Sequence, residues 1–425
     1  MNISIKVFPA SYGDSFLVSC FGKKKINILI DTGFKSTYDE VIKKELLKLK
    51  EQKEDLRLVV FTHIDEDHIL GGIKLLEENG LANSPNIINI EEIWHNSYKH
   101  MQFEKKLLID ELEIDSKSEG ILKDIVSKGF IKETGVRTVS NIGFNDASTL
   151  TGLLYKNDYI ERWNKQFNHQ AIMVSKEENK LKNINLSDEV KLTLLSPSLE
   201  KLKELDKKWE KYLKELGYEQ EIMSNQLLED AFEIHLANSL EEKKNTRKTK
   251  NVSGEIFEIE DIIKEDIFVP DKKEVNGSSI SFILNFKGKK ILFLGDSHSD
   301  VIEESLMTLY EENAGERLFF DVVKISHHGS KHNTSPKFLQ MIKADKYIIS
   351  SNGRGKGFKH PDIETLSRII VSNKEPKKII FNYKPVHLYE KIDIPELKEK
   401  YKYELEYFND RTQSIFNEVV NIVLE

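Results

Sequence analysis

Short apolar runs that end on polar or glycine residues recur near both ends of the chain. Such runs cover residues 3–18, 26–33, 56–61 and 87–94, and later 281–286, 290–296, 320–325, 347–351 and 377–383. Their length and their content of Ile, Val, Leu and Phe predict buried β-strands. Apolar residues at helical spacing follow residue 68 and fill residues 361–372, which predicts helices next to these strands.

The middle of the chain has a different pattern. Residues 91–271 are rich in Lys and Glu, and helical spacing predicts helices at 98–114, 118–132, 199–216 and 225–240. An apolar run at 190–197 predicts one strand that returns to the core sheet. Residues 241–254 are charged and lack apolar periodicity, so we expect a loop there, with a basic arm for nucleic acid as the alternative.

Four side chains that commonly bind metals occur within six positions, directly after the run 56–61. Residues 62–71 read T-H-I-D-E-D-H-I-L-G, in which His63, Asp65, Asp67 and His68 form H-x-D-x-D-H. Because the predicted helix begins near His68, its N-terminal N–H groups favour anionic ligands. Imidazole nitrogens suit zinc, iron or manganese, and carboxylates can bridge two ions. We therefore expect this loop to bind two metal ions.

The motif resembles that of the metallo-β-lactamase superfamily of binuclear hydrolases, whose usual form is H-x-H-x-D-H. Asp65 replaces the second histidine, and a similar variant occurs in the lactamase-like domain of the DNA-uptake competence channel and in choline-phosphate esterases. A carboxylate makes the site harder, so Mn²⁺ competes with Zn²⁺. The resemblance implies an α/β fold, the αββα sandwich, as one domain. Its core would be 1–96, 190–198 and 275–425, with a mainly helical insertion at 97–274.

Three later segments resemble further motifs of this superfamily, in the same order. Residues 290–296 read K-I-L-F-L-G-D and end on Asp296, at the position of the family's bridging aspartate. Residues 320–330 end in S-H-H-G-S and contain His327 and His328, and His360 follows the next predicted strand. The resemblance thus implies a first ion on His63, Asp65 and one of His327 or His328, and a second on Asp67, His68 and His360. Within the pair we expect His328 to be the ligand and His327 to face the substrate.

Three further polar residues are expected to support the ligands. Asp14 and Asp31 follow the first two strands, where the superfamily has aspartates that hydrogen-bond to the ligand loop. Their alternative interpretation is as turn formers next to glycines. Asn276 lies in a segment that resembles the one where other members have a further histidine. His95 and Asn96 lie either at the rim of the metal site or, with Trp94, in the core.

Charge restricts the substrates that the protein can bind. The formal net charge of −8 and the pI near 5.9 argue against tight, nonspecific binding to duplex DNA. A local basic patch of Arg354, Lys356 and Lys359 precedes His360. Such a patch suits a short single strand, a nucleotide or a cyclic nucleotide better than a long duplex.

Composition is consistent with a soluble enzyme. The chain has 39% hydrophobic and 32% charged residues, and no apolar run approaches the roughly 18 residues of a membrane helix. The N-terminus lacks the pattern of a secretory signal, so we expect a cytoplasmic protein that does not bind membranes. A single cysteine, Cys20, excludes an intramolecular disulfide.

The predicted activity is hydrolysis of a phosphodiester by two divalent ions, Zn²⁺ or Mn²⁺, acting on nucleic acid or a nucleotide. Asp67 would bind an ion and orient the attacking water, and His327 would bind a substrate oxygen or protonate the leaving group. The helical insertion would dock a protein partner within a multi-protein system, with a lid or a dimer arm as the alternatives. Two alternatives stay open: a hydrolase of a lactone, thioester or amide, and a metal-stabilised binding or scaffold protein.

Overall fold

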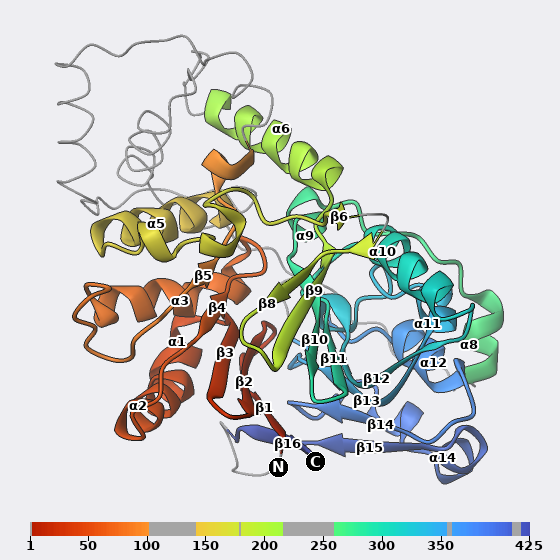
Figure 1. Ribbon diagram of the computed structural model, residues 1–425. Coiled ribbons are helices and arrows are strands. Elements are labelled where there is room, and N and C mark those ends of the chain that lie inside the picture. The colour runs from red at the N-terminus through yellow and green to blue at the C-terminus, as the bar shows by residue number, and fades with distance from the viewer. Residues whose placement is uncertain (1, 102–141, 178–179, 216–258, 355–358, 410–417) are drawn as a thin grey trace, which may run out of the picture.

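The described part of the computed structural model forms two large mixed sheets (Figure 1). It comprises residues 2–101, 142–177, 180–215, 259–354, 359–409 and 418–425. Within these residues, a six-stranded sheet has the order β16 (Val420–Leu424), β1 (Ile3–Val7), β2 (Ser15–Phe21), β3 (Lys25–Thr32), β4 (Leu58–Val60) and β5 (Ile93–Trp94). Because β1 pairs with β16, the two ends of the chain lie side by side.

The other large sheet has eight strands within the described residues and is parallel over most of its width. Its order is β15 (Tyr403–Tyr407), β14 (Lys377–Phe381), β13 (Ile342–Ile349), β12 (Leu318–Lys324), β11 (Lys289–Phe293), β10 (Ser281–Phe286), β9 (Val190–Ser196) and β8 (Asn183–Asn185). The strands from β11 to β15 run parallel, so the chain leaves β11, β12, β13 and β14 at the same edge. A small separate hairpin joins β6 (Lys176–Glu177) to β7 (Lys180–Leu181).

Successive side chains along a strand point to opposite faces of the sheet and so pack into different layers of the core. In β2, Phe16 and Val18 belong to the apolar cluster between the two sheets, whereas Leu17 belongs to the cluster under the N-terminal helices. This is the period of two expected for a strand that is covered on both faces. The outer face of the eight-stranded sheet has its own cluster with the C-terminal helices. The predicted αββα sandwich is therefore confirmed.

Helices cover the outer face of each sheet (Figure 1). On the six-stranded side the helices are α1 (Lys35–Thr37), a π-helical turn (Tyr38–Ile42), α2 (Lys43–Glu51), α3 (Glu66–Asn79) and α5 (Ile142–Lys156). On the other side they include α8 (Ile259–Glu265), α10 (Ser299–Glu312), α11 (Pro336–Met341), α12 (Ile363–Val371), α13 (Tyr389–Ile392) and α14 (Pro395–Tyr401). Two more, α6 (Leu199–Glu215) and α9 (Glu274–Gly277), pack against each other near the sheet ends.

Parts of the predicted insertion are built into the sandwich. Helix α5 packs on α3 and adds Leu150 and Leu154 to the outer cluster, and β9 pairs with β10 as expected for residues 190–197. The predicted helix at 199–216 is α6. The predicted helices at 118–132 and 225–240 and the loop at 241–254 lie outside the described residues. Of the predicted helix at 98–114, only a 3₁₀ turn (Tyr98–Met101) is described. The division into core and insertion stays a prediction.

The predicted strand at 87–94 is much shorter than expected, since only Ile93 and Trp94 form a strand and Ile90 adds an isolated parallel bridge to Leu56. The first residues of the predicted strand are held by Asn79 at the end of α3, whose Oδ1 accepts hydrogen bonds from the backbone N–H groups of Ile87 and Ile88. These groups are therefore not available to a neighbouring strand. No helix of the described residues has the length and apolar character needed to cross a bilayer.

Gly71 allows α3 to approach the end of β3. A Cβ at Gly71 would lie 2.2 Å from the carbonyl oxygen of Thr32, and the Gly71 N–H donates to the Gly33 carbonyl at 2.9 Å. We expect Gly71→Ala to lower the free energy of unfolding by about 1–3 kcal/mol, because the helix must shift away from the strand. Thermal unfolding measures this loss. Glu77→Ala, an exposed change on the same helix, should have a much smaller effect. An equal effect of both changes would contradict this explanation.

Lys377 at the start of β14 gives a pH dependence of stability. Its ammonium group is buried and donates to the carbonyl oxygens of Ile370 and Asn373 at 3.0 and 2.6 Å. Burial lowers the pKa of Lys377 to about 8. The unfolded chain has a Lys pKa near 10.4, so between pH 8 and about 10.4 the unfolded chain binds more protons.

Stability conferred by Lys377 should therefore rise with pH across this window. Urea unfolding at a series of pH values should show that the wild type gains stability relative to Lys377→Met between pH 8 and about pH 10. Lys374→Met, at an exposed lysine in the preceding turn, is the matched control and should leave the pH dependence unchanged. A constant difference between the wild type and Lys377→Met would refute the assignment.

Candidate metal centre

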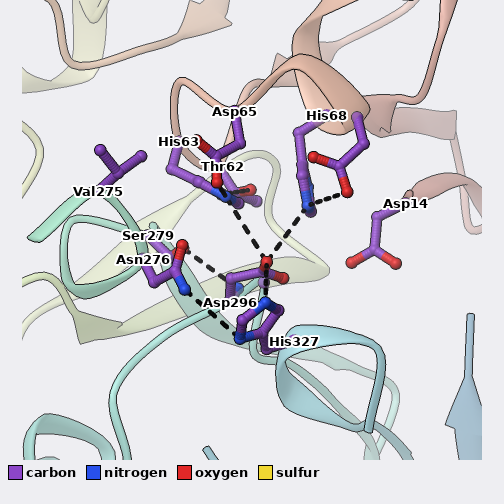
Figure 2. A network of polar contacts seen from close by, with 12 residues as sticks. Asp14, Thr62, His63, Asp65, His68, Val275, Asn276, Ser279, Asp296 and His327 are labelled. Atoms are coloured by element: carbon purple, nitrogen blue, oxygen red, sulfur yellow. Dashed lines mark hydrogen bonds and ion pairs between the residues drawn. The ribbon is translucent and has the colours of Figure 1, made fainter. Parts of the chain in front are cut away.

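The predicted site residues come from loops that follow strands of both large sheets. His63 follows β4, Asp296 follows β11, and His327 and His328 follow β12 in a short 3₁₀ turn (Ser326–Gly329). His68 lies in the first turn of α3, whose N-cap residue is Asp65. Chain segments far apart in sequence thus meet at one end of the sandwich, as Figure 2 shows for the side chains.

One carboxylate oxygen lies at the middle of this group. The Oδ2 atom of Asp296 is 3.5 Å from His68 Nε2 and 3.7 Å from the Nε2 atoms of His63, His327 and His328. In Figure 2, the imidazoles of His63 and His68 lie on one side of Asp296 and that of His327 lies on the other. The Asp296 N–H donates to the Ser279 hydroxyl at 3.1 Å. Apart from His327, which is half-buried, these ligand-type residues are buried.

The other ring nitrogen of each histidine has a partner on the outside of the group. His68 Nδ1 lies 2.8 Å from Asp31 Oδ2, and His328 Nδ1 lies 3.0 Å from the Ser350 carbonyl oxygen. His63 Nδ1 lies 3.0 Å from the Thr62 hydroxyl, which itself donates to Asp31 Oδ2 at 2.7 Å. Because these acceptors can only receive a proton, each Nδ1 is the protonated nitrogen.

His327 is held in the same way. Its Nδ1 lies 2.9 Å from Asn333 Oδ1. The orientation of the Asn333 amide is set by its Nδ2, which donates to Asp271 Oδ2 and to the carbonyl oxygens of Asp296 and Ser297. Asp271 Oδ2 is also 3.6 Å from His327 Nδ1. In all four histidines Nδ1 is thus turned away from Asp296 and Nε2 faces it, so Nε2 is the atom that an ion would take from each ring.

This arrangement fits divalent ions. The buried Nε2 atoms of His63, His68 and His328 have no hydrogen-bond partner among the described residues, which is costly for a buried polar atom. Two ligands about 2.1 Å from a tetrahedral ion lie about 3.4 Å apart, close to the distances between these nitrogens and Asp296 Oδ2. The outer hydrogen bonds to Nδ1 are those expected for metal-binding histidines.

Electrostatics within the group favours positive charge. Burial lowers the pKa of His68, but the carboxylates of Asp296 and Asp31 outweigh it and hold this pKa well above its usual range. Burial also lowers the pKa of His328, yet Asp296 and Asp14 raise it to about 10. Conversely, burial would raise the pKa of Asp296, but the imidazoles hold it well below its usual range. The carboxylates would attract cations as strongly as they attract protons.

Sets of ligand atoms that lie within 4.8 Å of one another divide the site differently from the sequence prediction. Among the described residues these sets are His63, His68 and Asp296; Asp67, His68 and His328; Asp14, Asp296 and His328; and Asp14, Asp31 and His68. Asp67 Oδ2 lies 3.3 Å from His328 Nε2 and 4.0 Å from His68 Nε2. His68 thus belongs both to the set that contains His63 and to the set that contains Asp67. The assignment of ligands to ions stays a prediction.

Two residues predicted to bind ions, Asp65 and His360, lie at the margin, as does His327, which was predicted to face the substrate. Asp65, His327 and His360 belong to none of these sets. Asp65 Oδ2 is 3.7 Å from His63 Nε2 and also contacts Lys273 Nζ. The His360 ring centroid is 5.1 Å from that of His327, and its Nδ1 is 3.3 Å from Asp362 Oδ2.

The predicted supporting residues occupy distinct places. Asp31 accepts hydrogen bonds from Thr62 and His68, as described above. Asp14 forms a buried ion pair with Lys324, and its Oδ1 is 3.4 Å from His328 Nδ1. Asn276 donates to Asp271 Oδ2 at 2.7 Å. Each one contacts a group that orients a histidine, or the histidine itself, and their roles in binding ions stay predictions.

Two backbone features bring the loops together. A Cβ at Gly13 would lie 2.0 Å from the Asp67 carbonyl oxygen, so only glycine allows the β1–β2 turn to reach the ligand loop. Asp31, His327 and His328 have positive φ angles of 51°, 47° and 55°. This conformation costs residues other than glycine about 1–3 kcal/mol each and is most common at functional sites.

The remaining predicted residues lie outside the cluster of ligand atoms. Arg354 and Lys359 are exposed on either side of residues 355–358, and Lys356 lies outside the described residues. His95 and Asn96 are buried, and Asn96 exchanges two hydrogen bonds of 2.8 Å with the backbone of Ile172. The core interpretation of His95 and Asn96 is therefore correct.

Comparison with known proteins agrees with this geometry. Residues 9–147 match the family model of the metallo-beta-lactamase superfamily. The chain has the metallo-β-lactamase fold. The match contains the H-x-D-x-D-H motif, Asp14 and Asp31, whereas Asp296, His327 and His328 lie beyond it and reach the site through the fold. The metallo-β-lactamase match and the His/Asp cluster indicate a metal-dependent hydrolase that uses divalent ions.

A curated relative supports the resemblance to the competence branch. ComE operon protein 3 of Bacillus subtilis (strain 168) is 27% identical to this chain over 115 residues. The aligned region covers 27% of this chain and 14% of that protein. The chain therefore spans a small part of this relative's length.

Several residues of the site were not identified from the sequence. Lys324 stands in the apolar run F-D-V-V-K-I, and a lysine in a buried strand is itself a signal of a buried partner. Asp271 and Lys273 carried no such signal, because the stretch P-D-K-K-E resembles a solvated charged loop. For Thr62, the sequence predicted only that it follows the end of a strand.

Asp31 provides a test of how the histidines are held. The Asp31 carboxylate accepts hydrogen bonds from the Thr62 backbone N–H, the Thr62 hydroxyl and His68 Nδ1. Asparagine has one acceptor oxygen and cannot receive all three. We expect Asp31→Asn to weaken the binding of Mn²⁺ or Zn²⁺ by about 10- to 100-fold, measured by calorimetric titration. Asp55→Asn, at an exposed site, is the control. Unchanged affinity in a folded Asp31→Asn protein would show that Asp31 does not support the centre.

Proposed function

We propose that the protein is a binuclear phosphodiesterase or nuclease that acts on short single-stranded nucleic acid or on nucleotides. The observation that carries the proposal is the convergence of four imidazole Nε2 atoms on Asp296 Oδ2, with Asp67 next to them. A stabilising site for a single ion would not need a shared carboxylate and ligands on several sides of it. Two-ion centres of this kind are common among enzymes that cleave phosphate esters.

Charge near the centre supports an anionic substrate. Arg354 and Lys359 are exposed in the loop that precedes His360, and His360 lies next to His327. The net charge of −8 disfavours a long duplex, because such binding depends on many clustered cations. The H-x-D-x-D-H variant resembles that of branches that act, or are thought to act, on phosphate esters, which favours a phosphodiester over a lactone, thioester or amide.

The side chains of the site have separate tasks in this proposal. Bound divalent ions supply positive charge for the phosphoryl oxygens and activate water for attack. His63, His68, His328, Asp67 and Asp296 would hold these ions, and Asp31, Thr62 and Ser350 keep the imidazoles oriented. His327 is half-buried and faces both Asp296 and the more exposed side of the site, where it can contact a substrate oxygen.

The helical insertion is proposed to dock a protein partner. Helix α6 is strongly amphipathic in sequence, and its described apolar residues Leu202, Leu205 and Trp209 pack on the protein itself. Its charged face is thus the part that a partner would meet.

Asp67→Ala tests the proposed activity. We expect wild-type protein to bind about two ions per chain and to hydrolyse bis-p-nitrophenyl phosphate and a fluorescent single-stranded oligonucleotide with Mn²⁺. The variant should lose at least about 100-fold in rate, because a charge-stabilising group next to the reaction is removed. Plasma mass spectrometry gives the metal content, and Glu77→Ala on the same helix serves as the control.

Other results would point elsewhere. Cleavage of lactones without cleavage of phosphodiesters would favour another scissile bond. Hydrolysis that survives in Asp67→Ala would exclude this centre as its source, and wild-type protein that cannot bind divalent ions would rule out the proposal.

A further inference from the structure

Lys273 places its ammonium group on a carboxylate that is predicted to bind the first ion. Lys273 Nζ contacts Asp65 Oδ2, and His63 Nε2 is 3.7 Å from the same oxygen. In contrast, the ion pairs of Asp67 in the described chain involve only His68 and His328. The two predicted ion positions therefore differ in charge: at one of them a lysine ammonium group, on a side chain that is 47% exposed, already contacts the carboxylate.

The base of the Lys273 side chain is firmly held. Its backbone N–H donates to Asp271 Oδ1 at 3.0 Å, and its carbonyl oxygen accepts from His298 Nε2 at 3.1 Å. Lys273 is also the N-cap residue of α9, and its carbonyl accepts from Gly277 N–H. Only the flexible part of the side chain can move, so the ammonium group stays within reach of Asp65.

Apolar packing holds the backbone next to both Asp65 and Lys273. Ile64, which precedes Asp65, and Val275, which follows Lys273 by two residues, are buried in one apolar cluster. Leu202, Leu205 and Trp209 of α6 also belong to that cluster, which is completed by Tyr98, Met101, Ala147 and Ala171. Lys208 of α6 also pairs with Glu274 at 2.5 Å. The insertion helix thus covers the backbone next to both partners of the ion pair.

We propose that Lys273 competes with the first ion for Asp65, so that the two ions bind this protein with unequal affinity. An ion at Asp65 must displace the ammonium group or bind beside it, and two positive charges a few ångströms apart repel each other. The second ion, on Asp67 and its histidines, meets no such contact within the described residues. The inference rests on the proposed binuclear centre. The first ion should bind on the order of 10- to 100-fold more weakly than the second.

Calorimetric titration of the full metal-free chain with Mn²⁺ tests this proposal without an activity assay. The wild type should show two binding phases of unequal affinity. In Lys273→Met and Lys273→Gln the weaker phase should tighten by about tenfold or more, because the competing charge is gone. Lys273→Arg keeps the charge and should resemble the wild type. Lys272→Met removes the same charge at the neighbouring exposed residue and should also leave both phases unchanged.

The possible results separate this inference from the proposed function. If folded Lys273→Met and Lys273→Gln proteins keep the weak phase unchanged, or lose it, Lys273 does not compete and the inference is wrong. Two equally tight phases in the wild type would also overturn the inference but leave the binuclear centre intact. Equal tightening in Lys272→Met would assign the effect to net charge and not to Lys273. Failure of every protein to bind Mn²⁺ or Zn²⁺ would instead refute the binuclear centre itself.

Discussion

The structure of the site depends on how buried carboxylates are neutralised. Asp14, Asp31 and Asp296 are buried, and their nearest partners are imidazoles, Lys324 and hydroxyl or N–H donors. An ionised group that is buried without such partners would cost several kcal/mol, so these contacts are a condition for the strand ends to meet. The loops, the left-handed backbone at the histidine pair and the close approach at Gly13 all serve this one arrangement. Divalent ions would complete it, because the buried Nε2 atoms point to where positive charge is needed.

The same constraint connects the two sheets. Asp14 lies in the β1–β2 turn of one sheet, and Lys324 ends β12 in the other, so their ion pair spans the sandwich next to the site. The Lys324 ammonium also donates to the Gly295 carbonyl at 3.0 Å, directly before Asp296. A lysine that is this deeply buried fixes the relative position of three ligand loops. The centre is therefore part of the core of the fold and not an addition to its surface.

The sequence was sufficient for some of these features and not for others. Strand ends and ligand-type residues are local patterns, so the positions of His63, Asp296 and His328 at strand ends could be predicted, as could the sandwich. The short β5 could not, because no sequence pattern shows that the nearby side chain of Asn79 accepts hydrogen bonds from the backbone where the strand was expected to begin. The partner of Asp65 could not be predicted either. Lys273 follows it by about two hundred residues, in a stretch that resembles solvent-exposed loop.

The position of Ile64 gives the insertion a direct physical connection to the chemistry. Ile64 lies between His63 and Asp65, is 1% exposed, and packs with α6 in a cluster that also includes Val275. Close-packed side chains transmit displacement, so a shift of α6 would move both the ligand loop and the base of Lys273. Ile64 is thus covered by α6 while Asp65, the next residue, is half-buried, so packing on one side holds the backbone of a side chain that reaches the ligand cluster on the other.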